Sequence, residues 1–187
     1  MKHIGNIMPK TIYGFLKHLE HIRGFCVNTL AHETIYLFPE TLRASLPRIG
    51  MMTDSRGLVW FVNDHWTVPS FYAYQTGTNA LNSYQGPFVN EDGTSLGITS
   101  CKCIVEDKDN NMWIGTNIGP FMLETDQITA TSPILTQVKV PRNDGTNYAD
   151  YLLSGVNIQS IVVDKNNRKW FGTNGNGLYL IAAGEKH

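Results

Sequence analysis

The sequence predicts an all-β fold, a partial β-propeller of about three four-stranded blades that follows a short helical or irregular N-terminal segment. Three observations lead to this prediction. The chain contains an internal repeat, and each copy of it has the pattern of short strands joined by a tight turn. The chain is also rich in glycine, with 17 among 187 residues, and glycine favours tight turns.

The repeat is defined by an aspartate that precedes a tryptophan by six positions. The pairs are Asp54 with Trp60, Asp107 with Trp113, and Asp164 with Trp170. The tryptophans of successive repeats lie 53 and 57 residues apart. Apolar residues before the aspartate and a turn residue after it keep the same register, so the sequence predicts three related units in tandem.

Each unit is expected to begin with a strand, turn sharply, and continue into a second strand that the tryptophan opens. The third residue after the aspartate is Gly57, Asn110 or Asn167, and these residue types tolerate a positive φ best. In two units the second strand ends at a Gly-Thr pair. These pairs are Gly115 with Thr116, and Gly172 with Thr173.

Further strands are predicted to complete each blade. A third strand is expected over residues 71–74, 121–123 and 178–181, where apolar and aromatic residues gather. A fourth is expected over residues 136–140, which alternate with a period of two. Four short antiparallel strands per unit is the construction of a propeller blade.

The repeated aspartates and tryptophans are interpreted as structural residues. The carboxylates are expected to accept hydrogen bonds from turn amides rather than to act as catalytic acids. The three tryptophans are expected to wedge between neighbouring blades as core anchors. A ligand-stacking role for one of the tryptophans is the alternative.

With these residues, the pattern Asp-x-x-Gly/Asn-x-x-Trp-Ile/Phe-Gly-Thr-x-x-Gly-Leu resembles the two-component regulator propeller repeat. That family builds periplasmic sensor regions of hybrid two-component systems in polysaccharide-degrading bacteria. Residues 140–153, running on to the third unit, are also similar to surface propeller proteins of the same bacteria, some of which serve type IX secretion. The resemblance covers about residues 47–181.

The resemblance implies a non-catalytic, extracytoplasmic module, placed in the periplasm or at the cell surface. Its implied function is carbohydrate-related ligand sensing for a two-component signalling system. The alternative is a structural or protein-interaction part of a surface or secretion-associated complex. Because fold alone does not dictate function, these remain expectations from the family.

The chain is predicted to divide into residues 1–46 and the propeller repeats at 47–187, with blades near 47–97, 98–156 and 157–187. Residues 11–23 have the spacing of an amphipathic helix, and residues 38–46 are interpreted as the remnant of an upstream blade.

The first unit departs from the repeat pattern. It has Val62-Asn63 in place of Gly-Thr, and residues 64–70 predict a longer surface loop. Closed propellers have 4–8 blades. The predicted partners are therefore the remaining blades of a longer parent chain or, as the alternative, further copies of this chain.

Composition argues against two classes of partner. Lys and Arg total 15 and Asp and Glu total 16, so the net charge of −1 provides no electrostatic footprint for nucleic acid. No apolar run approaches the ~20 residues of a bilayer span, and no signal-peptide core is present, so no membrane insertion is predicted. Among the three cysteines, Cys101 and Cys103 are interpreted as buried small hydrophobes.

The sequence predicts no catalytic residue, no metal site and no cofactor. No nucleophile motif or P-loop is present. Residues 90–94 and 143–146 are oxygen-rich, but they lack the spacing of a calcium loop and are interpreted as blade-connecting turns. His18 and His21 stand three apart without an obvious third ligand and are interpreted as exposed side chains.

Aromatic side chains around the inserted loop of the first unit are the candidates for ligand binding. Aromatic faces suit the apolar side of a sugar ring. The sequence therefore predicts a glycan ligand at these residues, which are Trp66, Tyr72, Tyr74 and Tyr84.

Overall fold

The computed structural model describes residues 27–30, 33–36, 51–63, 68–75, 77–78, 80–142 and 144–182. These residues are β-strands, turns and one 3-10 segment, η3 (Thr125–Gln127). None of the described ranges contains a helix long and apolar enough to span a membrane. The predicted amphipathic helix at residues 11–23 and the predicted blade remnant at 38–46 lie outside the described residues.

The chain separates into two compact units. In the first, β1 (Val27–Leu30) and β2 (Glu33–Tyr36) form an antiparallel hairpin. The second unit contains all the other strands, and with them the three copies of the repeat.

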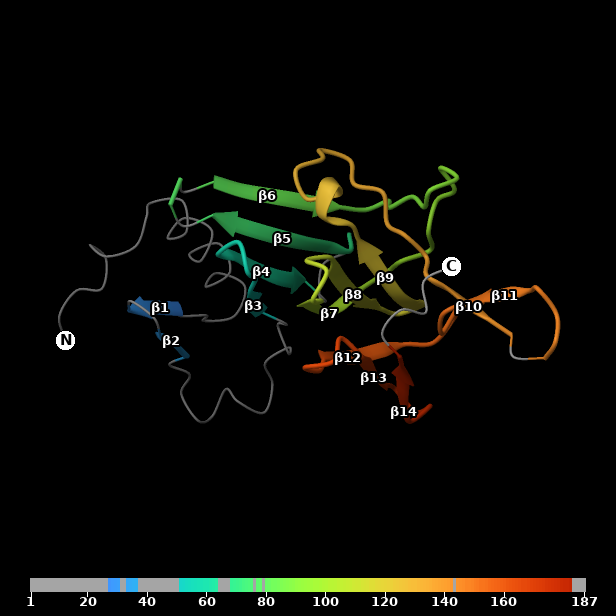
Figure 1. Cartoon of the computed structure of the whole chain (residues 1–187). Coiled ribbons are helices and arrows are strands. Elements are labelled where there is room, and N and C mark those ends of the chain that lie inside the picture. The colour runs from blue at the N-terminus through green and yellow to red at the C-terminus, as the bar shows by residue number, and fades with distance from the viewer. Residues whose placement is uncertain are drawn as a thin grey trace. The chain divides into compact units, whose positions relative to one another are not determined.

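The first copy of the repeat forms a four-stranded antiparallel meander, here called blade 1. Its strands are β3 (Met51–Thr53), β4 (Leu58–Asn63), β5 (Ser70–Gln75) and β6 (Ala80–Gln85), hydrogen-bonded in that order. The predicted third strand is therefore present as β5 (Figure 1). Much of the predicted long loop, residues 64–67, lies outside the described residues.

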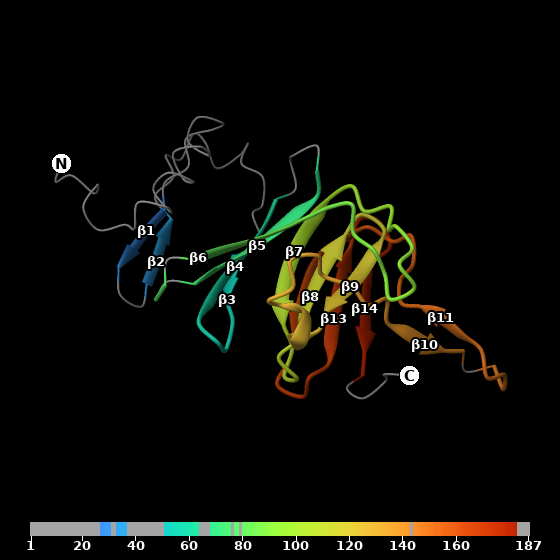
Figure 2. The same cartoon turned by 90° about the horizontal axis from the view of Figure 1, so that it is seen from above.

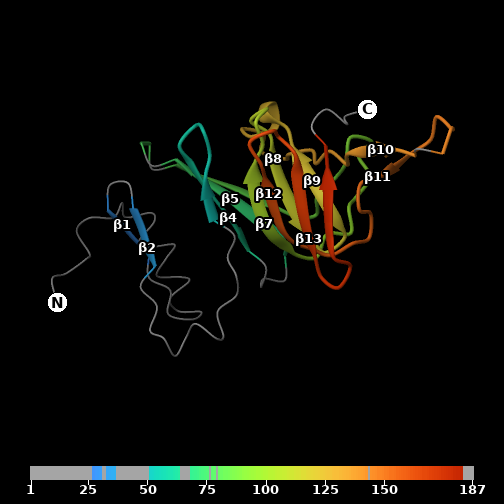
Figure 3. The same ribbon diagram turned by 60° about the horizontal axis from the view of Figure 1, so that its bottom comes forward.

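The other two copies form three-stranded meanders of the same kind, which lie side by side (Figures 2 and 3). Blade 2 consists of β7 (Cys101–Glu106), β8 (Met112–Thr116) and β9 (Gly119–Leu123). Blade 3 consists of β12 (Ile158–Val163), β13 (Lys169–Thr173) and β14 (Leu178–Ile181). The architecture is thus an all-β partial propeller, as the repeat predicts.

The predicted fourth strand at residues 136–140 is divided between two partners. Thr136 makes one antiparallel bridge to Met122 of β9, with N–O distances of 2.8 and 3.0 Å. Further along, the Leu152 amide donates to the Val138 carbonyl at 2.8 Å, so the chain leaves the blade. There β10 (Lys139–Pro141) pairs with β11 (Ala149–Tyr151) in a two-stranded ribbon that projects from the blades (Figure 1).

Two apolar clusters hold the blades together. The first cluster combines the inner faces of blades 1 and 2, and its largest fully buried members include Trp60, Phe71, Phe121 and Ile114. The second combines blades 2 and 3 around Trp113, Ile158 and Phe171. Each cluster draws side chains from two neighbouring sheets, so each blade is stabilised mainly by the next blade.

The Gly-Thr pairs have a steric and a hydrogen-bonding role. A Cβ added to Gly115 would lie 2.5 Å from Cys103 Sγ and 2.9 Å from Ile158 Cγ2, so only glycine allows blade 3 to approach. Thr116 Oγ1 donates to the Gly119 carbonyl at 2.7 Å, and Thr173 repeats this bond to the Gly177 carbonyl at 2.7 Å. The pair therefore ends the second strand and allows close packing of the neighbouring blade.

We predict that Gly115→Ala lowers the free energy of unfolding by about 1–3 kcal/mol, because the added methyl group overpacks the contact with Cys103 and Ile158. Urea unfolding followed by tryptophan fluorescence measures this change. The matched control is Gly97→Ala, since a Cβ there meets no atom within 4 Å. Equal stabilities of the two variants would contradict this account of Gly115.

Candidate functional site

The aspartate of each repeat accepts three hydrogen bonds in the same arrangement. Its Oδ1 accepts from the backbone amides two and four residues later, and its Oδ2 accepts from the indole Nε1 of the tryptophan six residues later. For Asp107, the donors are Asp109 N at 2.9 Å, Asn111 N at 3.0 Å and Trp113 Nε1 at 2.9 Å.

Asp54 and Asp164 repeat this pattern. Both Oδ1 atoms accept turn amides at 2.8–3.0 Å. The indole bonds are 2.8 Å from Trp60 to Asp54 and 3.3 Å from Trp170 to Asp164. The turn bonds are those that the sequence predicts, whereas the indole bond was not foreseen. The spacing of six residues brings the indole to the carboxylate in all three repeats.

The turn between the aspartate and the tryptophan closes through the backbone. The amides of Gly57, Asn110 and Asn167 donate to the carbonyls of their aspartates at 3.0–3.1 Å. All three residues have positive φ, of 80°, 64° and 61° respectively. This left-handed conformation explains why only glycine and asparagine occupy the position.

Trp60 and Trp113 lie in the two inter-blade clusters. Trp60 is fully buried and stacks on Tyr84, with ring centroids 5.8 Å apart. Trp113 packs against Phe171 of blade 3, also at 5.8 Å between centroids, and lies beneath the Lys169 ammonium. Trp170 is only partly buried. The first two tryptophans thus have both a polar anchor on their own blade and apolar contacts with the next blade.

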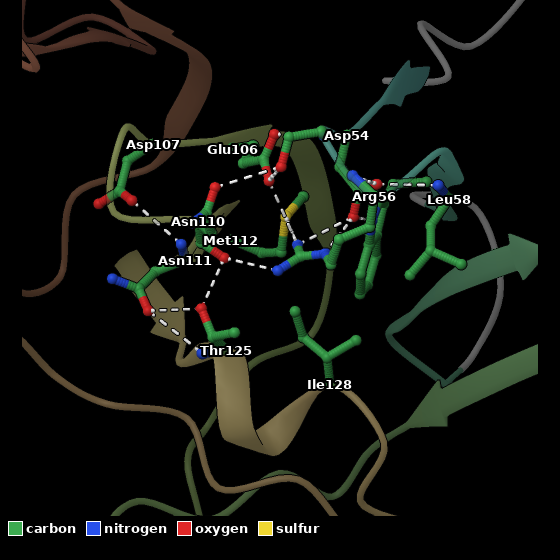
Figure 4. A network of polar contacts seen from close by, with 12 residues as sticks. Asp54, Arg56, Leu58, Glu106, Asp107, Asn110, Asn111, Met112, Thr125 and Ile128 are labelled. Carbon is green, nitrogen blue, oxygen red and sulfur yellow. Dashed lines mark hydrogen bonds and ion pairs between the residues drawn. The ribbon is translucent and has the colours of Figure 1, made fainter.

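Polar contacts join the turn of blade 1 to blade 2 (Figure 4). The Ser55 amide and hydroxyl both donate to the Glu106 carboxylate at 2.7 Å. Arg56 lies beside this contact and donates to Asp54 Oδ2 at 2.8 Å and to the Asn110 carbonyl at 2.9 Å. Its guanidinium also lies 3.4 Å from Glu106 Oε1. The sequence interpretation did not assign any role to Arg56 or Glu106.

Blade 2 contacts blade 3 in a related way. The Lys108 amide donates to Asn167 Oδ1 at 3.0 Å, and Asn167 Nδ2 donates to Asp109 Oδ2 at 3.1 Å. The Lys169 ammonium, buried from solvent, lies 3.3 Å from Asp107 Oδ2. Asn167 therefore combines a turn conformation with an inter-blade hydrogen bond. The presence of asparagine rather than glycine is the one signal in the sequence that points to this contact.

Two of the aspartates are held in their charged form. Burial raises the pKa of Asp107, but the hydrogen bonds from Trp113 and Asn111 and the charge of Lys169 outweigh it, so the pKa lies below its ordinary value. Burial likewise opposes the charged form of Asp164, but the bonds from Arg168, Asn166 and Trp170 prevail and lower its pKa to about 2. These carboxylates serve as acceptors, and a general acid at neutral pH needs a raised pKa instead.

Of the predicted sugar-stacking residues, the structure does not present Tyr72, Tyr74 or Tyr84 on an open surface. Tyr84 is 2% exposed, lies between Trp60 and Phe71, and donates its hydroxyl hydrogen to the Ile128 carbonyl. Tyr72 and Tyr74 are each 4% exposed, and Tyr72 stacks on Phe61 at 5.0 Å between centroids. Tyr72 and Tyr74 lie two apart on β5 and share one face of blade 1, whereas Tyr84, opposite Phe71, lies on the other face. Trp66 lies outside the described residues.

The oxygen-rich loops have the geometry of turns. Asn90 Oδ1 accepts the amides of Asp92 at 3.1 Å and Thr94 at 2.9 Å, and Asp144 Oδ1 accepts the Thr146 amide at 3.0 Å. No group of three or more His, Cys, Asp and Glu side chains lies close enough to hold a metal ion in the described part of the chain. His18 and His21 lie outside that part.

The two described cysteines are unpaired with each other and enclosed by protein. Cys101 is fully buried and Cys103 is partly buried between blades 2 and 3. Burial raises the pKa of each thiol to about 12. Because the thiolate is the reactive form of cysteine, burial disfavours the reactive form of both residues, which pack within the apolar clusters.

Comparison with protein families identifies the repeat. Residues 95–117, which contain Asp107, Trp113 and the first Gly-Thr pair, match the family described as two component regulator propeller. The repeat is similar to the two component regulator propeller repeat. No curated protein is similar enough in sequence to be counted as a relative of the chain.

Solved structures resemble this chain, and the first of the following two shares its fold. One is PorZ, an essential bacterial surface component of the type-IX secretion system of Porphyromonas gingivalis, with 24% identity and a TM-score of 0.56 over 78% of this chain and 21% of PorZ. Another is the extracellular domain of the putative hybrid two component system BT3049 from B. thetaiotaomicron, with 18% identity and a TM-score of 0.41. That match covers 80% of this chain and 16% of the other, so the chain spans about a fifth or less of either structure's length.

We predict that Asp107→Asn lowers the free energy of unfolding by about 2–4 kcal/mol. The amide group would turn a donor toward the Trp113 indole or toward the turn amides, and it would leave the buried Lys169 charge unpaired. Chemical denaturation of the chain measures the loss.

The matched control is Asp164→Asn, which changes the same position of the repeat in blade 3. Its carboxylate is paired with Arg168, a residue 43% exposed in its side chain, so solvent can replace the lost partner. We expect a smaller loss than at Asp107, and the double variant Asp107→Asn/Lys169→Met should regain part of the stability. A larger loss at Asp164 would show that the inter-blade ion pair is unimportant.

The low pKa values of Asp107 and Asp164 predict acid-labile stability. Both groups have a pKa below that of an unfolded aspartate, about 3.9. Their contribution is therefore complete above about pH 5 and lost as the pH falls, for Asp164 toward its folded pKa of about 2. Thermal melts from pH 7 to pH 2 should show this fall, and Asp164→Asn should flatten it. Asp126→Asn, at an exposed residue of η3, controls for net charge and should leave the slope unchanged.

Proposed function

We propose that the chain is a non-catalytic, extracytoplasmic propeller segment that serves ligand sensing in a two-component signalling system. The observation that carries this proposal is the two component regulator propeller repeat at residues 95–117, whose turn and tryptophan recur in all three blades. The chain would act in the periplasm or at the cell surface, without inserting into the membrane and without binding nucleic acid. The remaining blades of a longer chain would complete the ring.

The chemistry of the repeat supports binding rather than catalysis. Each repeat carboxylate accepts two turn amides and an indole N–H and is also paired with one cation, so its acceptor sites are occupied. Of the described residues that carry charge between the blades, Arg56 pairs with Asp54 and Glu106, and Lys169 pairs with Asp107. A ligand must therefore contact segments that lie outside the inter-blade contacts.

The β10–β11 ribbon is such a segment and supplies exposed aromatic faces. Tyr148 is 69% exposed and Tyr151 is 39% exposed, beside the ion pair of Arg142 with Asp150, in which Nε lies 2.6 Å from Oδ2. Aromatic rings together with hydrogen-bonding charges suit a carbohydrate, whose ring has one apolar side and many hydroxyls. We propose a glycan as the ligand, bound at the ribbon and not at the buried tyrosines of blade 1.

We expect isothermal titration with a panel of plant and host oligosaccharides to give heat with at least one member. Tyr148→Ala should then weaken binding by about tenfold, since an aromatic contact contributes about 1 kcal/mol beyond its buried area. Tyr179→Ala removes a ring of blade 3 that is 38% exposed and is the matched control, with affinity unchanged. Absence of heat with every oligosaccharide would overturn the glycan proposal.

A second candidate function follows from the likeness to PorZ, which extends over 78% of this chain. In that case the chain would be a structural or protein-interaction part of a surface or secretion-associated complex. It would bind an envelope protein through the same ribbon and have no affinity for small molecules. Affinity capture from an envelope fraction, compared between the wild-type chain and the Tyr148→Ala variant, separates this function from glycan sensing.

A further inference from the structure

Blade 3 exposes an apolar face that has no covering element among the described residues. In register across its three strands lie Val162 of β12, Trp170 of β13 and Leu180 of β14. Val162 is 58% exposed, Leu180 is 44% exposed, and the neighbouring Leu178 is 65% exposed. So many exposed apolar side chains on one face of a sheet indicate an interaction surface.

The corresponding faces of the other blades are both covered. In blade 1 the same register positions are Met52, Trp60 and Ala73, and blade 2 packs on them. In blade 2 they are Val105, Trp113 and Met122, and blade 3 packs on them. The face of Trp170 is therefore equivalent to the two faces that form the interfaces between blades 1 and 2 and between blades 2 and 3. These two interfaces show which side chains of a neighbouring blade fit the face of Trp170.

One shared feature of the two covered interfaces is an acceptor for the first turn amide. The amide directly after the aspartate donates to a side chain of the next blade: Ser55 N to Glu106 Oε2 at 2.7 Å, and Lys108 N to Asn167 Oδ1 at 3.0 Å. In blade 3 the equivalent amide is that of Lys165. No described residue accepts from the Lys165 amide, so it is open to an acceptor from outside.

A second shared feature is that the Oδ2 atom of every repeat carboxylate is paired with one cation. Whether this cation belongs to the same blade or to the next blade decides which type of side chain from the next blade covers the carboxylate. Arg56 of blade 1 pairs with Asp54, and blade 2 covers that site with an apolar side chain, Met112. Asp107 has no such partner on its own blade, and blade 3 covers it with Lys169. Asp164 is paired with Arg168 on its own blade, which predicts an apolar covering residue like Met112.

We propose that the Trp170 face binds one further blade of the same repeat, with two defining side chains. The first is an acceptor for the Lys165 amide, either asparagine three residues after the aspartate or glutamate directly before it. The second is a long apolar side chain directly before the tryptophan, which covers Asp164. This selection of a neighbour rests on the proposal that further blades complete the ring, and it is independent of the glycan proposal.

A second copy of this chain fits the face less well. Its blade 1 would have to dock on Trp170, with Gly57 at the acceptor position and Thr53 before the aspartate. Gly57 has no side chain, and Thr53 is shorter and uncharged compared with Glu106. The amide of Lys165 would thus lose water without a strong acceptor, which is unfavourable. The face therefore favours a further blade over self-association.

The test extends the chain so that residues 124–181 are repeated once directly after Ile181, which adds a blade with the asparagine turn. Hydrogen exchange should slow at Lys165 by about tenfold or more relative to the original chain, because its amide becomes bonded and buried. Asn167→Gly in the added segment should abolish the protection at Lys165. Lys169→Met in the added segment should raise the melting temperature of the extended chain.

Three outcomes would overturn the proposal. Exchange at Lys165 that is unchanged in the extended chain would show that such a blade does not occupy the face. Protection of the Lys165 amide that survives Asn167→Gly in the added segment would show that the Trp170 face does not require this acceptor from its neighbouring blade. Concentration-dependent oligomers of the original chain that dissociate on Val162→Glu would show that a second copy is the occupant. None of these results bears on the oligosaccharide titration, so the two proposals fail separately.

Discussion

The hydrogen bond from a tryptophan indole to the aspartate six residues earlier connects the local turn with the packing of whole sheets. The carboxylate organises the turn through its Oδ1 and holds the indole through its Oδ2. Burying the Trp113 N–H without an acceptor would be costly, and so would burying the Asp107 charge without donors. Each group satisfies the other, so a large aromatic side chain can lie between two blades with no polar group left unpaired.

This arrangement makes the protein a row of coupled units. The second strand of a blade presents its tryptophan to the blade that follows and its alternate apolar residues, such as Ile114 and Phe171, to the blade before. Each blade is therefore stabilised by its neighbours. The polar contacts at the turns add selectivity to these apolar interfaces. Glu106 and Asn167 accept comparable amides from different positions, which shows that the interface needs the acceptor more than it needs a particular residue.

The same coupling engages the repeat residues in structural contacts. The repeat residues are occupied by contacts within and between blades, which leaves little of their chemistry for a ligand. The β10–β11 ribbon departs from the blade at Val138, where the chain pairs with Leu152 instead of β9. The segment that leaves the blade there carries the exposed rings of Tyr148 and Tyr151. Binding residues on insertions supported by a rigid scaffold are a common arrangement in proteins.

Much of the fold was readable from the sequence because its signals are local. The spacing from Asp107 to Trp113, the positive-φ residues Asn110 and Asn167, and the short apolar runs define a turn and its flanking strands within a dozen residues. The Gly-Thr pair marked the end of a strand, although the reason for Gly115, its contact with Ile158, involves a residue 43 positions away.

The candidate site depends on side-chain contacts between the blades, and no local sequence pattern predicts those contacts. Period-two alternation marks Tyr72 and Tyr74 as strand residues, but the layer that covers each ring is set by neighbouring elements. The pairing of Lys169 with Asp107 joins residues 62 positions apart, and a lone lysine in a strand carries no sign of its partner. The sequence by itself thus determined the blade, because turn and strand preferences act over a few residues. Only the tertiary structure decided which side chains face a neighbour and which face solvent, because the packing of one sheet on another is a long-range interaction.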